Sequence, residues 1–154
     1  MDIPLSKPDI TDKERSAVQE VLKTSSLSLG KNYIEFQNAI SKFVGVKYAV
    51  AVNSGTSALH LIIKALGIKK GDEVITTSFS FVASANCILY EGAKPVFVDI
   101  DEKTLNIDVS KIEAKITKKT KAILAVDVFS HPADWEVLKR IAKKGVDIDI
   151  ITGV

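Results

Sequence analysis

The feature that most constrains the fold of this 154-residue chain is an alternation of short apolar segments with amphipathic ones. The short segments have the length of buried strands, and in the amphipathic ones apolar residues recur every three or four positions, as on one helix face. The expected strands are Tyr48–Val52, Glu73–Thr77, Pro95–Ile100, Ala122–Val128 and a strand that begins at Val146. Because strand and helix alternate at least four times, we expect an α/β fold whose mostly parallel sheet carries helices on both faces.

The expected helices have recognisable ends. Thr11 and Glu14 form a capping box, in which each side chain accepts a hydrogen bond from a backbone N–H group at the start of the helix. The later helices are expected from Asn32 to Gly45, over Thr56–Leu66 and Phe81–Tyr90, from the cap Asp108 through Ile112 and Ile116, and from Pro132 to Gly145. We interpret residues 1–30 as an arm with a packing helix and residues 31–154 as the main α/β domain.

Charge and composition exclude several classes of protein. The net charge is only +2, so charge gives no case for nucleic-acid binding. The single cysteine, Cys87, excludes an intramolecular disulfide and a cysteine-based metal cluster, and it fits a reducing cytoplasm. A secretory signal is not visible at the N-terminus, and no apolar stretch approaches the ~20 residues that span a bilayer. We therefore expect a cytoplasmic protein that binds neither nucleic acid nor membrane.

The strongest local signal is the segment Asn53–Ser57, which stands between an expected strand and an expected helix. A small turn with a glycine leaves free N–H groups at a helix N-terminus, where the helix dipole adds partial positive charge, and such a site suits a phosphate. The alternative is an ordinary helix cap, because serine and threonine are common capping residues. The segment is neither a P-loop nor the glycine-rich loop of dinucleotide-binding proteins, which argues against a simple nucleotide-binding module.

Several longer motifs follow one another at sensible spacing. They are Asn53–His60, Gly71–Ile75, Ser78–Asn86, Gly92–Asp99 and His131–Asp134, together with Ile3–Pro8 and Leu27–Gly30 near the N-terminus. In this order they resemble the DegT/DnrJ/StrS family of pyridoxal-phosphate (PLP) aminotransferases that modify sugars. The resemblance covers about residues 3 to 145. It implies the N-terminal half of the large domain of a fold-type I PLP-dependent transferase.

The resemblance also implies a cofactor site. Gly55, Thr56 and Ser57 match the turn that holds the PLP phosphate, and Phe81 matches the aromatic residue that stacks on the cofactor ring. A flat aromatic face gives dispersion contact over a ring without competing hydrogen bonds. Without the family, burial of Phe81 in the core would be the preferred interpretation.

Other polar residues are interpreted as structural. His131 is expected to cap a helix or face solvent, His60 to lie within a helix, and Cys87 to be a small core residue. Asp99 and Asp101 have no histidine partner and are expected in turns, so no metal site is expected. Asp127 is placed inside an apolar strand, where a hydrogen-bonded structural role is expected.

The activity implied by the resemblance is transfer of an amino group, typically from glutamate, to a keto-sugar nucleotide, in an enzyme that is generally a homodimer. Two features of the family are not found in this sequence. The aspartate that pairs with the pyridine nitrogen would fall near Ile151, and no lysine has the context of the Schiff-base lysine. We therefore expect a truncated, partial PLP-binding domain that is inactive alone and exposes apolar surface. The alternative is a non-catalytic remnant or binding module. We also expect the tail from Val146 not to dock as it does in the intact enzyme.

Overall fold

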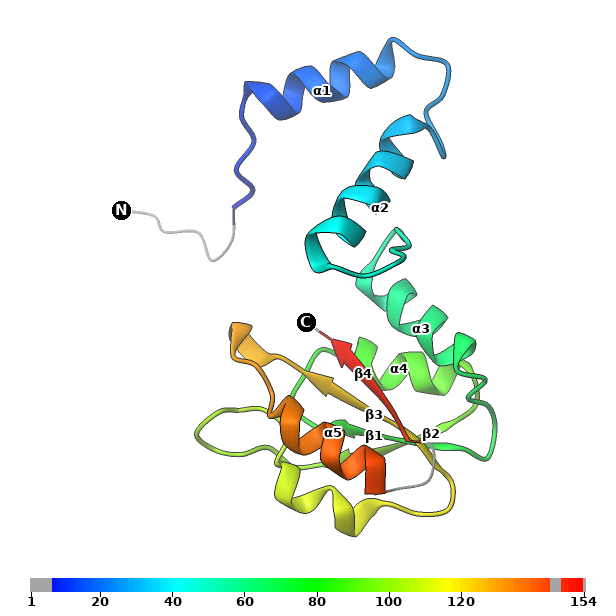
Figure 1. The fold of residues 1–154 in the computed structure, drawn as a ribbon, viewed down its shortest axis with the longest axis vertical. Helices are drawn as coiled ribbons and strands as arrows, with labels where there is room; N and C mark the ends of the chain where they lie inside the picture. The colour runs from blue at the N-terminus through cyan, green and yellow to red at the C-terminus, as the bar shows by residue number, and fades with distance from the viewer. Residues whose placement is uncertain (1–6, 145–147, 154) are drawn as a thin grey trace. The chain divides into compact units, whose positions relative to one another are not determined.

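The computed structural model describes residues 7–144 and 148–153, and the chain divides into two compact units, residues 1–51 and 52–154. The first unit contains the helices α1 (Asp12–Leu22) and α2 (Lys31–Val44) (Figure 1). The expected capping box is confirmed, because Thr11 and Glu14 both bind backbone N–H groups at the start of α1. The helix α2 ends at Gly45, whose φ of 76° is readily adopted only by a residue without a Cβ atom.

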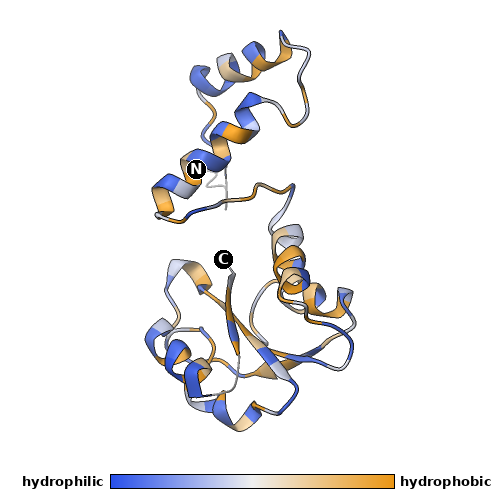
Figure 2. Ribbon diagram, turned by 45° about the vertical axis from the view of Figure 1, so that its right-hand side comes forward, coloured by the Kyte–Doolittle hydropathy of each residue, from blue (hydrophilic) through white to orange (hydrophobic). Residues whose placement is uncertain are grey.

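Both helices of the first unit are amphipathic, and hydrophilic and hydrophobic residues alternate along them in Figure 2. No residue of α1 or α2, which are both described in full, is buried. Phe36, Ile40 and Phe43 follow one another at the spacing of one helix face, and all three are exposed. The apolar face of α2 therefore has no covering layer among the described residues of its own unit.

The strand expected at Tyr48–Val52 is not formed, and this prediction was wrong. Two side chains of α2 bind the backbone of this segment instead. The Tyr33 hydroxyl donates to the carbonyl of Ala51 (3.0 Å), and the Ala51 N–H donates to Oε1 of Gln37 (3.0 Å). Apolar residues favour a strand only where a neighbouring strand completes the hydrogen-bond ladder, and these residues have none in the described part of the chain.

The second unit is built on a four-stranded sheet in which every pair of neighbouring strands is parallel. Its strands are β1 (Glu73–Thr77), β2 (Lys94–Val98), β3 (Thr120–Val126) and β4 (Asp149–Gly153), in the spatial order β2-β1-β3-β4. In the central pair Ile75 lies opposite Ile123, and Leu124 lies opposite Ile151 of β4. The expected parallel sheet is confirmed.

The strand expected in the tail is formed, and it is the edge strand β4 of the sheet. The strand β4 pairs with β3 from Asp149, opposite Ala122, to Gly153, opposite Val126. This pairing docks the tail on the sheet, although aspartates fit badly in a strand that is buried on both faces. Asp149 is exposed because it lies at the first position of an edge strand, so its carboxylate stays in water while Ile151 is buried. Asp147 and Gly145 lie outside the described residues.

Helices cover both faces of this sheet, as expected (Figure 1). On one face α3 (Gly55–Ala65) and α4 (Ala83–Tyr90) contribute Ile63, Cys87 and Ile88 to a core cluster. On the other face Leu138 and Ile141 of α5 (Trp135–Lys144) pack with a second cluster. Burial on both faces explains the continuous apolar sequence of β3 from Ala122 to Val126.

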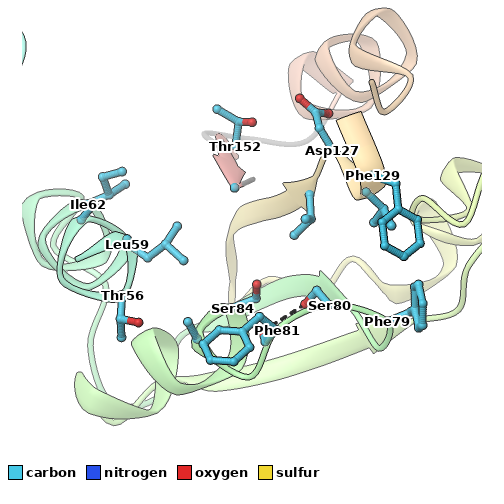
Figure 3. Close-up of a pocket in the computed structure, with 16 residues that line it drawn as sticks. Thr56, Leu59, Ile62, Phe79, Ser80, Phe81, Ser84, Asp127, Phe129 and Thr152 are labelled. Atoms are coloured by element: carbon cyan, nitrogen blue, oxygen red, sulfur yellow. Dashed lines mark hydrogen bonds between the residues drawn. The ribbon is translucent and has the colours of Figure 1, made fainter. Parts of the chain in front are cut away.

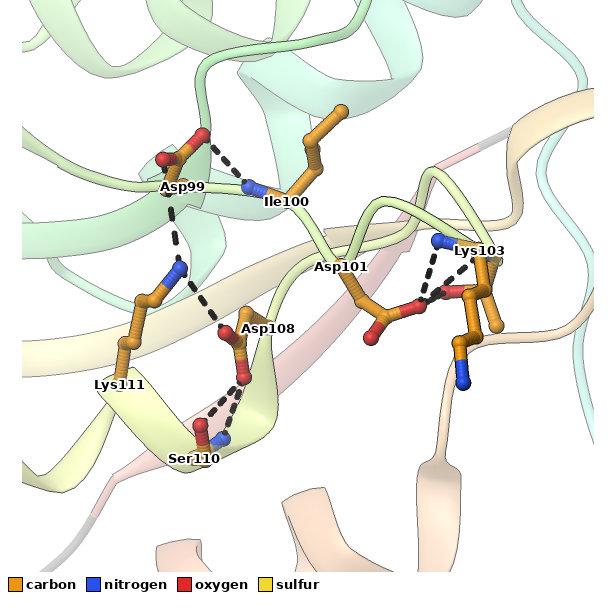
Figure 4. A network of polar contacts seen from close by, with 8 residues as sticks. Asp99, Ile100, Asp101, Lys103, Asp108, Ser110 and Lys111 are labelled. Carbon is orange, nitrogen blue, oxygen red and sulfur yellow. Dashed lines mark hydrogen bonds and ion pairs between the residues drawn. The ribbon is translucent and has the colours of Figure 1, made fainter.

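The helix expected after Asp108 is instead two short 3-10 turns, η1 (Val109–Lys111) and η2 (Glu113–Lys115). Asp108 does cap the first of them, since its carboxylate accepts from the N–H of Ser110 (3.0 Å), and Ile112 is buried as the helical pattern predicted. In Figure 4 the Lys111 ammonium lies between Asp108 (3.0 Å) and Asp99 (4.0 Å). The apolar pattern specified the buried face of this segment but not the type of helical turn.

The Asp101 carboxylate accepts from the N–H groups of Lys103 (3.0 Å) and Thr104 (2.9 Å) (Figure 4). It is therefore a turn residue, as expected, and the bonds from the Thr104 N–H and hydroxyl, with a smaller effect of the Lys103 N–H, lower its pKa. Among residues 7–144 and 148–153, no group of three or more His, Cys, Asp or Glu side chains could hold a metal ion. Nor does this part of the chain contain a helix long and apolar enough to cross a membrane.

Candidate functional site

A pocket of about 670 Å³ opens in the second unit, where β1, β3 and β4 end (Figure 3). Its walls come from α3, the loop after β1, the start of α4, and the segments at the ends of β3 and β4. The residues that line it are Gly55, Thr56, Ala58, Leu59, Ile62, Phe79, Ser80, Phe81, Ala83, Ser84, Val126, Asp127, Val128, Phe129, Thr152 and Gly153.

The strand order explains why the pocket forms here. The connection from β1 leads to β2 on one side, whereas β3 pairs with the other side of β1. The loops leaving these strands therefore diverge to opposite faces of the sheet. Such a switch point at the carboxyl ends of parallel strands leaves a crevice, and ligands of α/β proteins commonly bind there.

The N-terminus of α3 forms one wall. Ser54 caps this helix, and its Oγ accepts from the N–H of Ser57 (3.1 Å). The first helical bond runs from the Ala58 N–H to the Ser54 carbonyl (3.1 Å). Within the described residues, no hydrogen bond involves the N–H groups of Gly55 and Thr56, and both residues line the pocket. Two free donors and the positive end of a helix dipole can bind an anion.

Ser57 differs from its two neighbours in the sequence. Its N–H binds Ser54, and its hydroxyl donates to Oδ1 of Asn53 (2.7 Å). The residue does not line the pocket, so its polar groups stabilise the turn itself. The phosphate-binding role expected for Ser57 stays a prediction.

The loop after β1 forms the opposite side of the pocket. Phe81 precedes α4, which begins at Ala83 and not at Phe81 as expected, and the Phe81 carbonyl accepts from the N–H of Ser84 (3.1 Å). The Phe81 side chain is 76% exposed and lines the pocket. Core packing of Phe81 is thus excluded within this unit, and a large aromatic face remains available to a ligand.

The segment after β3 lines the pocket with Asp127 and with Phe129, a residue that the sequence did not single out. The strand ends at Val126, so Asp127 lies just beyond it and not inside it, and its Oδ1 accepts from the N–H of Ala133 (2.8 Å). Phe129 and Ser130 have φ angles of 52° and 63°, a region that is costly for residues with a Cβ atom. The rings of Phe129 and Phe79 meet edge to face, with centroids 6.4 Å apart. Backbone strain of this kind has no signature in the sequence.

The remaining candidates are structural. His60 pairs through Nε2 with Glu91 Oε1 (2.7 Å), and this bond lowers the pKa of Glu91. Cys87 is fully buried, and desolvation raises its pKa to about 11, so it is no nucleophile. His131 does not line the pocket, although its backbone carbonyl accepts from the Asn106 side chain (2.9 Å).

The position expected for the family aspartate faces the core. Ile151 is buried against Leu124, whereas the next residues of β4, Thr152 and Gly153, line the pocket. Asp149 lies by a separate hollow, which it lines with Gly67 and Lys69. No carboxylate of β4 reaches the pocket in the described part of the chain.

The sequence profile of the DegT/DnrJ/EryC1/StrS aminotransferases matches residues 8–152. The chain belongs to this family. The GDP-perosamine synthase of Escherichia coli O157:H7 is 46% identical over 142 residues, which are 92% of this chain and 39% of that protein. The chain thus spans about two fifths of the length of this relative.

Two solved structures share the fold of this chain. A sugar aminotransferase of Streptococcus pneumoniae in its PMP form matches 99% of this chain and 42% of its own, with a TM-score of 0.94 and 31% identity. The E. coli GDP-4-keto-6-deoxy-D-mannose-3-dehydratase with bound hydrated PLP matches 99% of this chain and 41% of its own, with a TM-score of 0.93 and 33% identity. The two proteins are named for different reactions, amino transfer and dehydration, and their structures are a PMP form and a form with bound hydrated PLP.

The pocket fits part of the family's cofactor. The N–H groups of Gly55 and Thr56 are free donors for a phosphate, and Phe81 offers a face for a flat ring. The volume of about 670 Å³ is in the range of small-molecule sites. None of the residues that line the described pocket is a lysine. The pocket therefore has donors for the phosphate and a face for the ring, but no amine.

Proposed function

We propose that this chain supplies the phosphate-binding and ring-binding part of a PLP-dependent aminotransferase that acts on a keto-sugar nucleotide. The observation that carries the proposal is the pair of free N–H groups at the start of α3, in one pocket with the exposed ring of Phe81. When bound, PLP would supply an electron sink for the transfer of an amino group. The protein contributes binding, orientation and exclusion of water.

Each residue has one proposed role. Gly55 and Thr56 donate backbone N–H groups to the phosphate, and the Thr56 hydroxyl adds a further donor. Ser57 supports them, because its bonds to Ser54 and Asn53 fix the turn. Phe81 covers one face of the ring. The apolar side chains of Leu59 and Ile62 exclude water from the same pocket.

The reaction partners are proposed from the relatives. Their names include a GDP-perosamine synthase and a UDP-2-acetamido-2-deoxy-3-oxo-D-glucuronate aminotransferase of Pseudomonas aeruginosa, so we propose a keto-sugar nucleotide as amino acceptor. Glutamate is the proposed donor. A homodimer, a cytoplasmic location and the division at residue 30 stay predictions.

A non-catalytic binding module of the same fold is the second candidate. It is favoured by one observation, the lack of a lysine among the residues that line the described pocket. PLP-dependent amino transfer needs such an amine as nucleophile and as proton carrier. In this case the chain would bind the phosphorylated cofactor without turning it over.

Calorimetric titration of the 154-residue chain with pyridoxamine 5'-phosphate (PMP) tests both candidates. PMP has no aldehyde, so it does not react with surface lysines. We expect PMP to bind and unphosphorylated pyridoxamine to bind much more weakly. Equal affinity for the two compounds would contradict the phosphate site. Amino transfer from glutamate to PLP, followed by absorbance, would favour the enzyme over the binding module.

A further inference from the structure

A buried asparagine contacts the segment after β3 at two points. Asn106 lies in the connection between β2 and β3 and is only 3% exposed. Its Oδ1 accepts from the N–H of Val128 (2.9 Å), and its Nδ2 donates to the carbonyl of His131 (2.9 Å). One amide side chain thus binds both ends of the segment Val128–His131. A buried amide that uses donor and acceptor is expensive to replace, because any partner left behind is unsatisfied.

The segment between these two bonds carries part of the pocket wall. Phe129 is in the left-handed region, with a φ of 52°, and its side chain is 81% exposed. Burial of its own ring therefore does not hold this conformation. Figure 3 shows the rings of Phe129 and Phe79 side by side at one end of the pocket, in edge contact. Both residues line the pocket, and Phe79 comes from the loop that also carries Phe81.

We propose that Asn106 is a positioning residue of the cofactor pocket, which holds Phe129 against Phe79 by fixing the backbone on both sides of it. This inference rests on the proposed function for the identity of the ligand, but not for the mechanical role of Asn106. Strained backbone at a site persists only where the surroundings over-determine it. Here the surroundings are the two hydrogen bonds from Asn106 and the bond from the His131 N–H to the Val128 carbonyl (3.0 Å), and Asn106 itself does not line the pocket.

Two variants of Asn106 and one control test the two hydrogen bonds. Asn106→Ala removes both. Asn106→Asp keeps an acceptor for Val128 but, when ionised, has no donor for His131. Protonation of this aspartate restores an O–H donor, and a buried carboxyl that faces a carbonyl oxygen favours the protonated form. Asn38→Ala is the matched control, because Asn38 is exposed on α2.

The test measures hydrogen exchange of backbone amides by NMR, contacts between the rings of Phe79 and Phe129, and the Kd for PMP. In Asn106→Ala we expect the Val128 amide to exchange roughly tenfold faster or more, with core amides such as that of Ile123 much less affected. The ring contact should weaken, and the Kd for PMP should rise several-fold. In Asn106→Asp, compared with the unmodified chain at the same pH, the ring contact and PMP binding should recover as the pH falls. Asn38→Ala should match the unmodified chain.

Two results would overturn the inference. One is an unchanged ring contact and unchanged Val128 exchange in Asn106→Ala. The other is faster Val128 exchange and a weaker ring contact with an unchanged Kd for PMP, which would show that Asn106 stabilises the fold without affecting the pocket. If Asn106→Ala does not fold, the pH-dependent recovery of Asn106→Asp decides, and its absence would sink the proposal. If the unmodified chain does not bind PMP, the proposed function fails, while loss of the ring contact in the variants still supports the positioning of Phe129.

Discussion

A substitution at the start of α3 should change ligand binding without lowering the stability of the fold. Apart from its chain neighbours and the backbone of its own helix, a Cβ atom added at Gly55 would have no protein atom within 4 Å, and the residue lines the pocket. Gly55→Ala should therefore leave the free energy of unfolding unchanged or raise it by about 0.5 kcal/mol, because alanine favours a helix.

The same change should weaken PMP binding by about tenfold or more, since a methyl group would crowd the N–H donors that we assign to the phosphate. Thermal unfolding measures the change in stability, and calorimetric titration measures the affinity for PMP. Thr24→Ala, in the loop between α1 and α2, serves as control. Retention of full affinity by Gly55→Ala would argue against phosphate at this turn.

Cys87 provides a test of burial at the residue scale. Desolvation raises its pKa to about 11, so the folded state holds the thiol proton more tightly than the unfolded state does. Its contribution to stability is therefore complete below the ordinary thiol pKa and is lost as the pH rises through about 11. At pH 8 we expect an aromatic disulfide reagent to react with Cys87 only after addition of denaturant. Rapid reaction of the folded chain would show that the helix α4 opens readily.

At the scale of elements, Glu73 links the start of β1 to the turn before β3. Its carboxylate accepts from the Thr117 hydroxyl (2.7 Å) and lies 3.3 Å from the Lys94 ammonium. The hydrogen bond from Thr117 lowers the pKa of Glu73. A lowered pKa means that the stabilisation is present above the unfolded pKa and is lost as the pH falls through the folded value.

Glu73→Gln should lower the free energy of unfolding by about 1 kcal/mol at pH 7, because a bond to a charged acceptor is replaced by a neutral one. The loss should shrink as the pH falls below the ordinary glutamate pKa. Urea unfolding at several pH values measures it, with the exposed Glu102→Gln as control. A loss that is the same at every pH would exclude the ionised carboxylate as the cause.

At the scale of the whole molecule, the exposed face of α2 predicts self-association. Phe36, Ile40 and Phe43 form one apolar stripe, and Phe43 is 89% exposed. We expect sedimentation velocity to show association that increases with concentration. Phe43→Glu should reduce it strongly, whereas Lys42→Glu, at the neighbouring position, should not. A monomer across a wide concentration range would contradict this prediction.

The second prediction for the whole molecule concerns the cofactor amine. Because no lysine is among the residues that line the described pocket, PLP should form no stoichiometric adduct with one lysine of the isolated chain. The chain is mixed with PLP, reduced with borohydride and mapped by mass spectrometry, and only scattered, substoichiometric labelling is expected. A single full adduct together with amino transfer from glutamate would prove this wrong.

The sequence by itself determined the α/β class, the parallel arrangement of the strands and the positions of most helices and strands in the second unit. Local signals carry these features: β1 matches its expected bounds, and the capping residues Thr11 and Asp108 act as predicted. The family motifs also marked Gly55, Thr56 and Phe81, which the structure brings into one pocket.

Only the tertiary structure decided which of these residues meet, and by what contacts. Tyr48–Val52 has strand composition but no partner for a ladder, so it stays irregular, whereas β4 docks despite Asp149 because that residue is at an exposed end. The sequence could not reveal that Asn106 binds a segment 22 and 25 residues further along the chain. Contacts of this kind depend on how the crossover connections return to the sheet, which is a property of the assembled fold and not of any local pattern.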